Sequence, residues 1–206
     1  DLTSGFDADG AAAGTARDLM IHNYGGGVFE LGSNVVDNGD PVNLVIGGTG
    51  TTRLTGTNTH SGGTFLVGGT VEAGSDAVFG AAPLAADADN LYFNGSILRP
   101  TASFVIAANR GIPIGGEGGT LDIAAGLELV VGGNIASEAN YQSAENGYIR
   151  TLTSNPDYVD LYKAGDGKLT LTAKVNNSHT GRTVGRDGTL QLDIPTGNPN
   201  DLLGTD

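Results

Sequence analysis

Two histidines, His60 and His179, are the residues of this sequence best suited to chemistry. A histidine can transfer a proton near neutral pH or ligate a metal. Both, however, stand at the same place in a repeated pattern, because a threonine follows each of them ten residues later, Thr70 and Thr189. A catalytic or metal site has no reason to be copied into each repeat. We therefore interpret both histidines as structural residues that pack at a corner of the fold.

Carboxylates are the second candidate, since the chain has 23 acidic residues. Most of them adjoin glycine or asparagine, where an aspartate side chain binds the local backbone of a turn. Asp122 and Glu128 instead stand within apolar, strand-like segments. Two carboxylates in different environments are what a glycoside hydrolase needs for its acid and base. We expect no enzyme and no catalytic residue, and we keep a polysaccharide lyase or glycoside hydrolase as the alternative.

Metal and nucleophile chemistry have less support. The segments 7–10 and 87–90 are rich in aspartate, but neither has the full ligand set of a calcium loop. We expect no cofactor and no metal site, with calcium at these turns as the alternative. The chain has no cysteine and no Gly-x-Ser-x-Gly elbow.

The charge of the chain excludes one class of partner. A net charge of -13 would repel phosphate backbones, so we expect no binding to nucleic acid. No stretch approaches the ~20 apolar residues of a membrane helix, so we expect no membrane insertion of this segment. The sequence starts with Asp1 and no signal peptide, which suggests a mature product or a fragment of a longer protein.

The elements that position these residues belong to a glycine-rich repeat that occurs twice. Both copies contain the spacing Gly-x-Gly, then a histidine, glycine and threonine, then a glycine before the last strand. The shared positions are Gly48, Gly50, His60, Gly62, Thr64 and Gly69 in the first copy and Gly165, Gly167, His179, Gly181, Thr183 and Gly188 in the second. Repeats of this kind bury their apolar faces only by stacking on one another.

Short apolar runs between turn clusters predict strands throughout the chain, for example at 17–23, 28–31 and 42–46. The spacings are too short for crossover helices, so parallel pairing requires a coil made of strands. We therefore predict an all-β fold, a right-handed parallel β-helix. At roughly 20 residues per coil and ~4.8 Å between strands, it would have roughly ten coils and a length of about 45 Å.

We predict one solenoid segment over residues 1–206. The repeat copies span 45–80 and 161–204, and a β-rich block spans 91–136. The least glycine-rich stretch follows, and it predicts a loop insertion at 137–156 that protrudes near residues 134–156. Loops on a rigid scaffold often carry binding sites.

The motif from Lys163 to Leu171, Lys-x-Gly-x-Gly-x-Leu-x-Leu, and the segment 58–64 resemble the passenger-associated transport repeat, also called the autotransporter-associated β-strand repeat. His60 stands where this family usually has tyrosine. The resemblance implies an autotransporter passenger at the bacterial cell surface or outside the cell, with a structural or adhesive role. The end coils of such a rod carry unpaired N–H and C=O groups, so we expect as partners the chain itself or neighbouring solenoid segments stacked end to end. Outward Thr and Ser residues make surface glycans a further expected partner. A subunit of an extracellular filament or sheath is the alternative.

Overall fold

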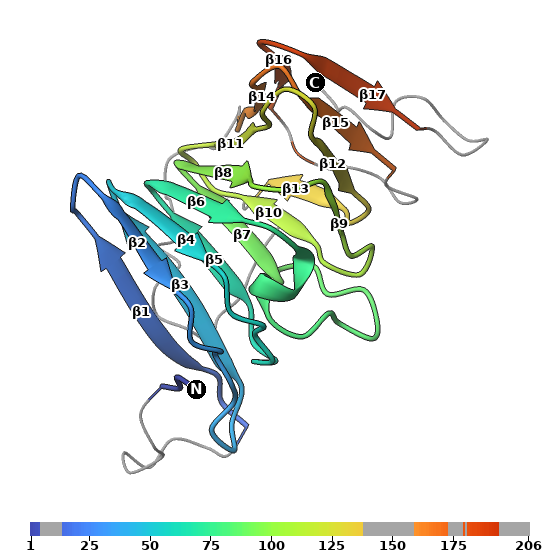
Figure 1. Cartoon of the computed structure of the whole chain (residues 1–206). Helices are drawn as coiled ribbons and strands as arrows, with labels where there is room; N and C mark the ends of the chain where they lie inside the picture. Colours follow the sequence, from blue (N-terminus) through green and yellow to red (C-terminus); the bar gives the residue numbers. More distant parts are fainter. Residues whose placement is uncertain (5–13, 138–158, 173–178, 180, 194–206) are drawn as a thin grey trace.

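The computed structural model describes residues 1–4, 14–137, 159–172, 179 and 181–193. Within them the chain forms β-strands and one short 3-10 helix, η1 (Asp76–Phe79) (Figure 1). The strands are β1 (Arg17–Asn23), β2 (Val28–Leu31), β3 (Val42–Gly48), β4 (Thr51–Leu54), β5 (Thr64–Val67), β6 (Thr70–Ala73), β7 (Leu91–Asn94), β8 (Ser96–Pro100), β9 (Phe104–Ile106), β10 (Ile112–Ile114), β11 (Gly119–Asp122), β12 (Glu128–Val131), β13 (Ile135–Ser137), β14 (Leu161–Ala164), β15 (Lys168–Leu171), β16 (Thr183–Gly185) and β17 (Thr189–Leu192).

These strands form three sheets, and the neighbouring strands of the described residues pair in parallel. The first sheet has the order β1-β3-β5-β7-β10-β13, the second β16-β14-β11-β8-β6-β4-β2, and the third β17-β15-β12-β9. The chain passes from one sheet to the next and returns one layer further along, so its strands stack as successive coils (Figure 1). The prediction of an all-β parallel solenoid is confirmed.

The number of coils is smaller than the roughly ten predicted, because each coil is longer than assumed. The strands of the first sheet start at residues 17, 42, 64, 91, 112 and 135, so successive starts are 21 to 27 residues apart. The longest interval contains η1 and the turns after it. The solenoid therefore has about six turns.

The predicted loop at 134–156 starts later than expected. Ile135–Ser137 forms strand β13, which pairs with β10 and continues the first sheet. The remainder of the predicted loop falls in residues 138–158, which lie outside the described residues, as does the end of the second repeat copy after residue 193.

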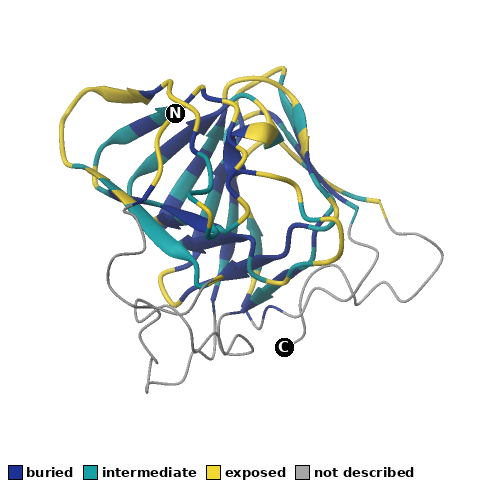
Figure 2. Cartoon of the chain, turned by 90° about the horizontal axis from the view of Figure 1, so that it is seen from below, coloured by how far each residue is buried: buried dark blue, intermediate teal, exposed yellow. Residues whose placement is uncertain are grey.

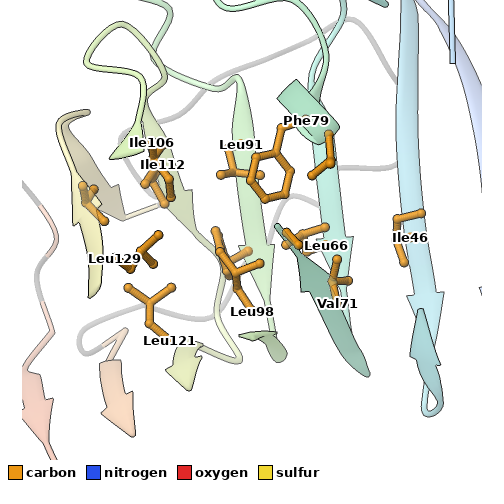
Figure 3. Packing of buried hydrophobic residues seen from close by; sticks show 14 of the residues in the cluster. Ile46, Leu66, Val71, Phe79, Leu91, Leu98, Ile106, Ile112, Leu121 and Leu129 are labelled. Atoms are coloured by element: carbon orange, nitrogen blue, oxygen red, sulfur yellow. The ribbon is translucent and has the colours of Figure 1, made fainter. Parts of the chain in front are cut away.

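The core lies inside the coil, where residues at equivalent positions of successive strands stack. Ile21, Ile46, Leu66, Phe93 and Ile114 form one such inward row of the first sheet. Figure 2 shows the buried residues gathered in the interior, and Figure 3 shows how residues of neighbouring coils, such as Ile46 and Leu66, pack there. Each added coil extends these rows, which is how short strands bury their apolar faces.

The two repeat copies occupy different faces of the solenoid. In the first copy, β3 and β5 belong to the first sheet while β4 and β6 belong to the second. In the second copy, β14 and β16 belong to the second sheet while β15 and β17 belong to the third. The same sequence pattern therefore makes the corner between the first and second sheets in one place and the corner between the second and third in the other.

Candidate functional site

The glycines of the repeat lie where one coil approaches the next most closely. Gly48 has φ 102°, and a Cβ there would lie 2.1 Å from the carbonyl oxygen of Asn23 in the preceding coil. Gly165 has φ 73°, and its Cβ would lie 2.3 Å from the carbonyl oxygen of Ile123. A side chain at either corner would overlap backbone, so only glycine fits. These corners are structural in both copies.

His60 lies in the segment between β4 and β5 and is fully buried. Its Nε2 is 3.1 Å from the Thr64 hydroxyl, which donates to the carbonyl oxygen of Phe79 at 3.1 Å. The Thr64 hydroxyl donates its only proton to Phe79, so it must accept a hydrogen bond from His60. The proton of the neutral His60 ring is therefore assigned to Nε2. Burial lowers the pKa of His60 to about 4; nearby Arg110 also lowers it and Asp37 opposes the shift. The ring is therefore neutral at pH 7.

His179 makes the equivalent contact in the second copy. It is fully buried, and its Nε2 lies 3.0 Å from the Thr183 hydroxyl. Burial lowers its pKa as well. In both histidines Nδ1 is buried, and no described residue forms a hydrogen bond with it. The part of the chain that is described contains no group of three or more His, Cys, Asp or Glu side chains able to hold a metal ion.

Arg110 is a buried cation that the sequence analysis missed. Its side chain is fully buried, and Nε donates to Asp76 at 2.9 Å. Its Nη atoms donate to the side chain of Asn90 and to the carbonyl oxygens of Phe79 (3.2 Å) and Gly80 (2.6 Å), with longer bonds to Asp76 and Ala81. This one guanidinium thus holds the segment after η1 against the next coil. A lone arginine between short apolar runs was the only sequence signal for it.

Lys163 is a second buried cation, and it lies within the second repeat copy. It stands opposite Leu121 in the inward row of the second sheet. Its ammonium donates to the carbonyl oxygens of Ala164 (3.0 Å), Gly165 and Asp187 (2.9 Å). Burial lowers its pKa, and the carboxylates of Asp187, Asp166 and Asp122 oppose that shift. Lys163 thus links the corner glycine, Gly165, to the turn of the next coil that contains Asp187.

A row of alternating charges runs along the outer side of the second sheet, and we call it the ion ladder. Its members stand on β2, β4, β6, β8 and β11: Glu30, Arg53, Glu72, Arg99 and Asp122. Arg53 lies 2.7 Å from Glu72, and Arg99 lies 3.0 Å from Asp122 and 3.7 Å from Glu72. In a parallel sheet equivalent residues stack directly, so like charges in this row would repel and alternating charges attract. The ladder therefore favours the observed register.

Asp122, a candidate acid or base in the enzyme alternative, is thus one end of the ladder. Glu128 lies on β12 in the third sheet, on the far side of the corner at 123–127. Its carboxylate contacts Lys168 at 2.9 Å and accepts from Thr170 at 2.7 Å, and these hydrogen bonds lower its pKa. The two carboxylates lie on different sheets and each is bound to its own cation. Among the described contacts, none links Asp122 to Glu128.

The aspartate-rich turn at 87–90 is held by its own side chains. Asp87 accepts from the amide of Asp89 at 3.4 Å and from Asn90 at 3.1 Å. Burial alone would raise the pKa of Asp87, but these hydrogen bonds outweigh it and lower the pKa. Burial raises the pKa of Asp89 to about 7, and the neighbouring carboxyl of Asp87 adds to the shift. Calcium at this turn stays a prediction, and the turn at 7–10 lies outside the described residues.

The described residues include no helix that is long and apolar enough to cross a membrane.

Comparison with known proteins identifies the repeats. The family model of the passenger-associated transport repeat matches residues 47–73 and 161–192, which together enclose the strands from β4 to β6 and from β14 to β17. The chain carries two passenger-associated transport repeats. The same corner at two places on the solenoid is therefore the structure of this repeat.

A curated relative places these repeats in a larger context. The adhesin BmaC autotransporter of Brucella suis biovar 1 (strain 1330) is 30% identical to the chain over 178 residues. The match covers 84% of this chain and 5% of that adhesin, so the chain spans a small part of the relative's length. No solved structure matches the chain. The chain is therefore similar to a small part of a protein that is named an autotransporter adhesin.

Proposed function

We propose that this chain is a non-catalytic, rod-forming segment of an autotransporter passenger, displayed at the bacterial cell surface or outside the cell, with a structural and adhesive role. One observation carries the proposal: the polar side chains best suited to chemistry are engaged in contacts within or between coils of the fold. His60 binds Thr64, Arg110 binds the backbone after η1, and Asp122 is paired with Arg99.

The adhesive part of the proposal rests on the relative, which is named an adhesin. The solenoid offers adhesion a suitable geometry, because parallel coils present outward rows of residues at regular spacing along three faces. With strands ~4.8 Å apart, the seven strands of the second sheet extend over about 30 Å. Such faces are long enough to contact an extended glycan or a matrix protein.

The test compares the folded chain with a matched unfolded control. Beads coated with the chain, and beads coated with the same chain after heat denaturation, are exposed to glycan arrays and to immobilised extracellular-matrix proteins. Adhesion predicts binding by the folded chain only. No binding on a broad panel would remove the adhesive role and leave the structural one.

The same material tests the absence of catalysis. Acidic and neutral polysaccharides are incubated with the chain and assayed for new reducing ends and unsaturated products. Turnover that is lost in both the Asp122→Asn and Glu128→Gln variants would contradict the proposal and support the polysaccharide-active enzyme.

A second candidate, end-to-end stacking into a filament or sheath, is favoured by the exposed strands at the N-terminal end. Met20 on β1 is 39% exposed, and Val28 and Phe29 on β2 are 50% and 45% exposed. Strand edges with exposed apolar side chains promote pairing with other strands. Electron microscopy across a concentration series tests it: filaments support stacking, and dispersed short rods at high concentration exclude it.

A further inference from the structure

The second sheet stops at β2 although its inward row does not end there. β2 pairs with β4, and within the described residues no strand pairs with its other edge. Phe29 stands in register with Thr52 of β4, which is followed by Val71 and Leu98 in the same row. Val71 and Leu98 are fully buried, whereas Phe29 is 45% exposed. The core row is therefore open at this end.

The ion ladder is also incomplete at this end. Glu72, inside the ladder, lies between two arginines and its side chain is 11% exposed. Glu30, at the end, has one arginine at 4.0 Å, and its side chain is 58% exposed. The alternation of the ladder continues beyond Glu30 only if the next strand supplies a cation.

The third face of the same end already carries part of a further layer. Leu2 forms a parallel bridge with Val35, with its amide donating to Asn34 at 2.7 Å and its carbonyl accepting from Val36 at 2.9 Å. Val35 follows Glu30 by five residues. A residue five positions before Leu2 would thus reach the level of Glu30 if the chain followed the same path one layer out.

We propose that the free edge of β2 is an interaction surface for a parallel strand of a neighbouring solenoid segment, with Arg or Lys opposite Glu30 and an apolar or threonine side chain opposite Phe29. The strand β4, Thr-Thr-Arg-Leu, already satisfies the opposite edge of β2 with this pattern. Such a strand completes the ladder with a cation and covers Phe29. The inference rests on the end-to-end candidate above and adds the chemistry that selects the partner.

The experiment supplies this strand within the full chain. The sequence of residues 51–56, Thr-Thr-Arg-Leu-Thr-Gly, is added directly before Asp1, which places its arginine five positions before Leu2. The matched control has glutamate in place of that arginine. Hydrogen exchange of the β2 amides and the urea midpoint are measured for both proteins, with and without the exposed, conservative Glu30→Gln substitution.

The arginine extension is expected to slow exchange in β2 about fivefold more than the glutamate extension, since opposed charges attract and like charges repel across neighbouring strands. Glu30→Gln is expected to remove most of that difference. Equal protection by both extensions, or a difference that survives Glu30→Gln, would overturn the proposal. Protection that appears in the unextended chain as its concentration rises, and that Glu30→Gln leaves unchanged, would show pairing at this edge without the charge dependence and would also overturn the proposal.

Failure here is distinguishable from failure of end-to-end stacking. Suppose that filaments form but hydrogen exchange of the β2 amides does not depend on the charge opposite Glu30. End-to-end stacking is then supported, and the proposed requirement for a cation opposite Glu30 is wrong. Suppose instead that no filaments form but the arginine extension slows exchange of the β2 amides more than the glutamate extension does. The preference of the β2 edge for a cation opposite Glu30 is then supported, and self-assembly of this chain is excluded.

Discussion

The two repeat copies have the same corner glycines but different side chains around them. Gly48 and Gly165 both have positive φ and both approach a carbonyl oxygen of the preceding coil. At three aligned positions, however, the first copy has Ile46, Arg53 and Glu72, and the second has Lys163, Thr170 and Gln191. Backbone geometry is thus the shared property of the repeat, while the charges vary with the face that each copy occupies.

The two copies also differ in whether their strands are flanked by other strands of the same sheet. The strands of the first copy have a paired neighbour on both sides, whereas β16 and β17 are the last strands of their sheets. In the first copy the His60 and Thr64 pair reaches a third group, the carbonyl of Phe79. For His179 and Thr183 the described residues show the pair alone. The same motif should therefore contribute more to stability in the first copy.

Alanine at the corner glycines should have the largest effect and should be similar in the two copies. Gly48→Ala and Gly165→Ala each combine a strained φ with an overlap of backbone atoms, so each should lower the free energy of unfolding by more than about 3 kcal/mol. Urea unfolding measures it. Gly26→Ala is the control, because a Cβ at Gly26 has nothing within 4 Å. A difference between the two copies of more than about 2 kcal/mol would contradict a common corner.

Acid should destabilise the protein through the buried histidines. His60 has a pKa of about 4 when folded and an ordinary value of 6.5, so between these pH values the unfolded chain binds a proton that the folded chain does not. Stability is therefore full above pH 6.5 and falls as the pH drops toward 4, by on the order of 3 kcal/mol for this residue. The pKa of His179 is shifted in the same direction.

Urea midpoints from pH 7.5 to 4 check this prediction. Subtracting the profile of His60→Gln from that of the parent isolates the histidine from the carboxylates that titrate nearby. A parent and variant with parallel profiles would show that His60 titrates normally in the folded chain.

Removing the threonine hydroxyl should lower stability by different amounts in the two copies. Thr64→Val leaves Nε2 of His60 without its partner in a buried site and removes one of the two donors to the Phe79 carbonyl, the other being Arg110, so we expect a loss of about 2 kcal/mol. Thr183→Val removes one described contact at a half-buried site, so we expect about 1 kcal/mol or less. Both variants are compared by urea unfolding at pH 7.5, where the histidines are neutral. Equal losses of unfolding free energy in the two variants would mean that the hydrogen bond from Thr64 to the Phe79 carbonyl does not contribute to stability.

The coil architecture could be predicted from the sequence because it depends on local signals. The glycine spacing marks corners, and apolar runs such as Val42–Ile46 mark strands, which the structure places in β3. The faces occupied by each copy could not be predicted, since they depend on the lengths of every intervening turn. The number of coils was overestimated for the same reason, as η1 and its turns lengthen one coil.

The polar contacts were harder to predict than the strands because they join residues far apart in the chain. Arg99 and Asp122 are 23 residues apart, and Arg110 and Asp76 are 34 residues apart. A partner is defined only once the register between coils is known, and one residue of slip would turn each side chain to the other side of the sheet. Asp122 consequently resembled a catalytic candidate in the sequence and is an ion-ladder residue in the structure.

Transferring the ion ladder from the first copy to the second should give the smallest effect. Thr170 and Gln191 are in register on β15 and β17, at the positions of Arg53 and Glu72. The double substitution Thr170→Arg and Gln191→Glu should raise the free energy of unfolding by about 0.5 kcal/mol, because the attraction between the new charges is offset by the burial of position 170, which is 5% exposed, and by the loss of the contact of Thr170 with Glu128. The gain should shrink in 0.5 M salt, since position 191 is exposed and ions screen exposed charges. The reversed pair, Thr170→Glu with Gln191→Arg, places a second carboxylate beside Glu128 and should give no gain. If both orders stabilise equally, propensity rather than charge order governs these rows, and the ladder of the first copy would then not select its register.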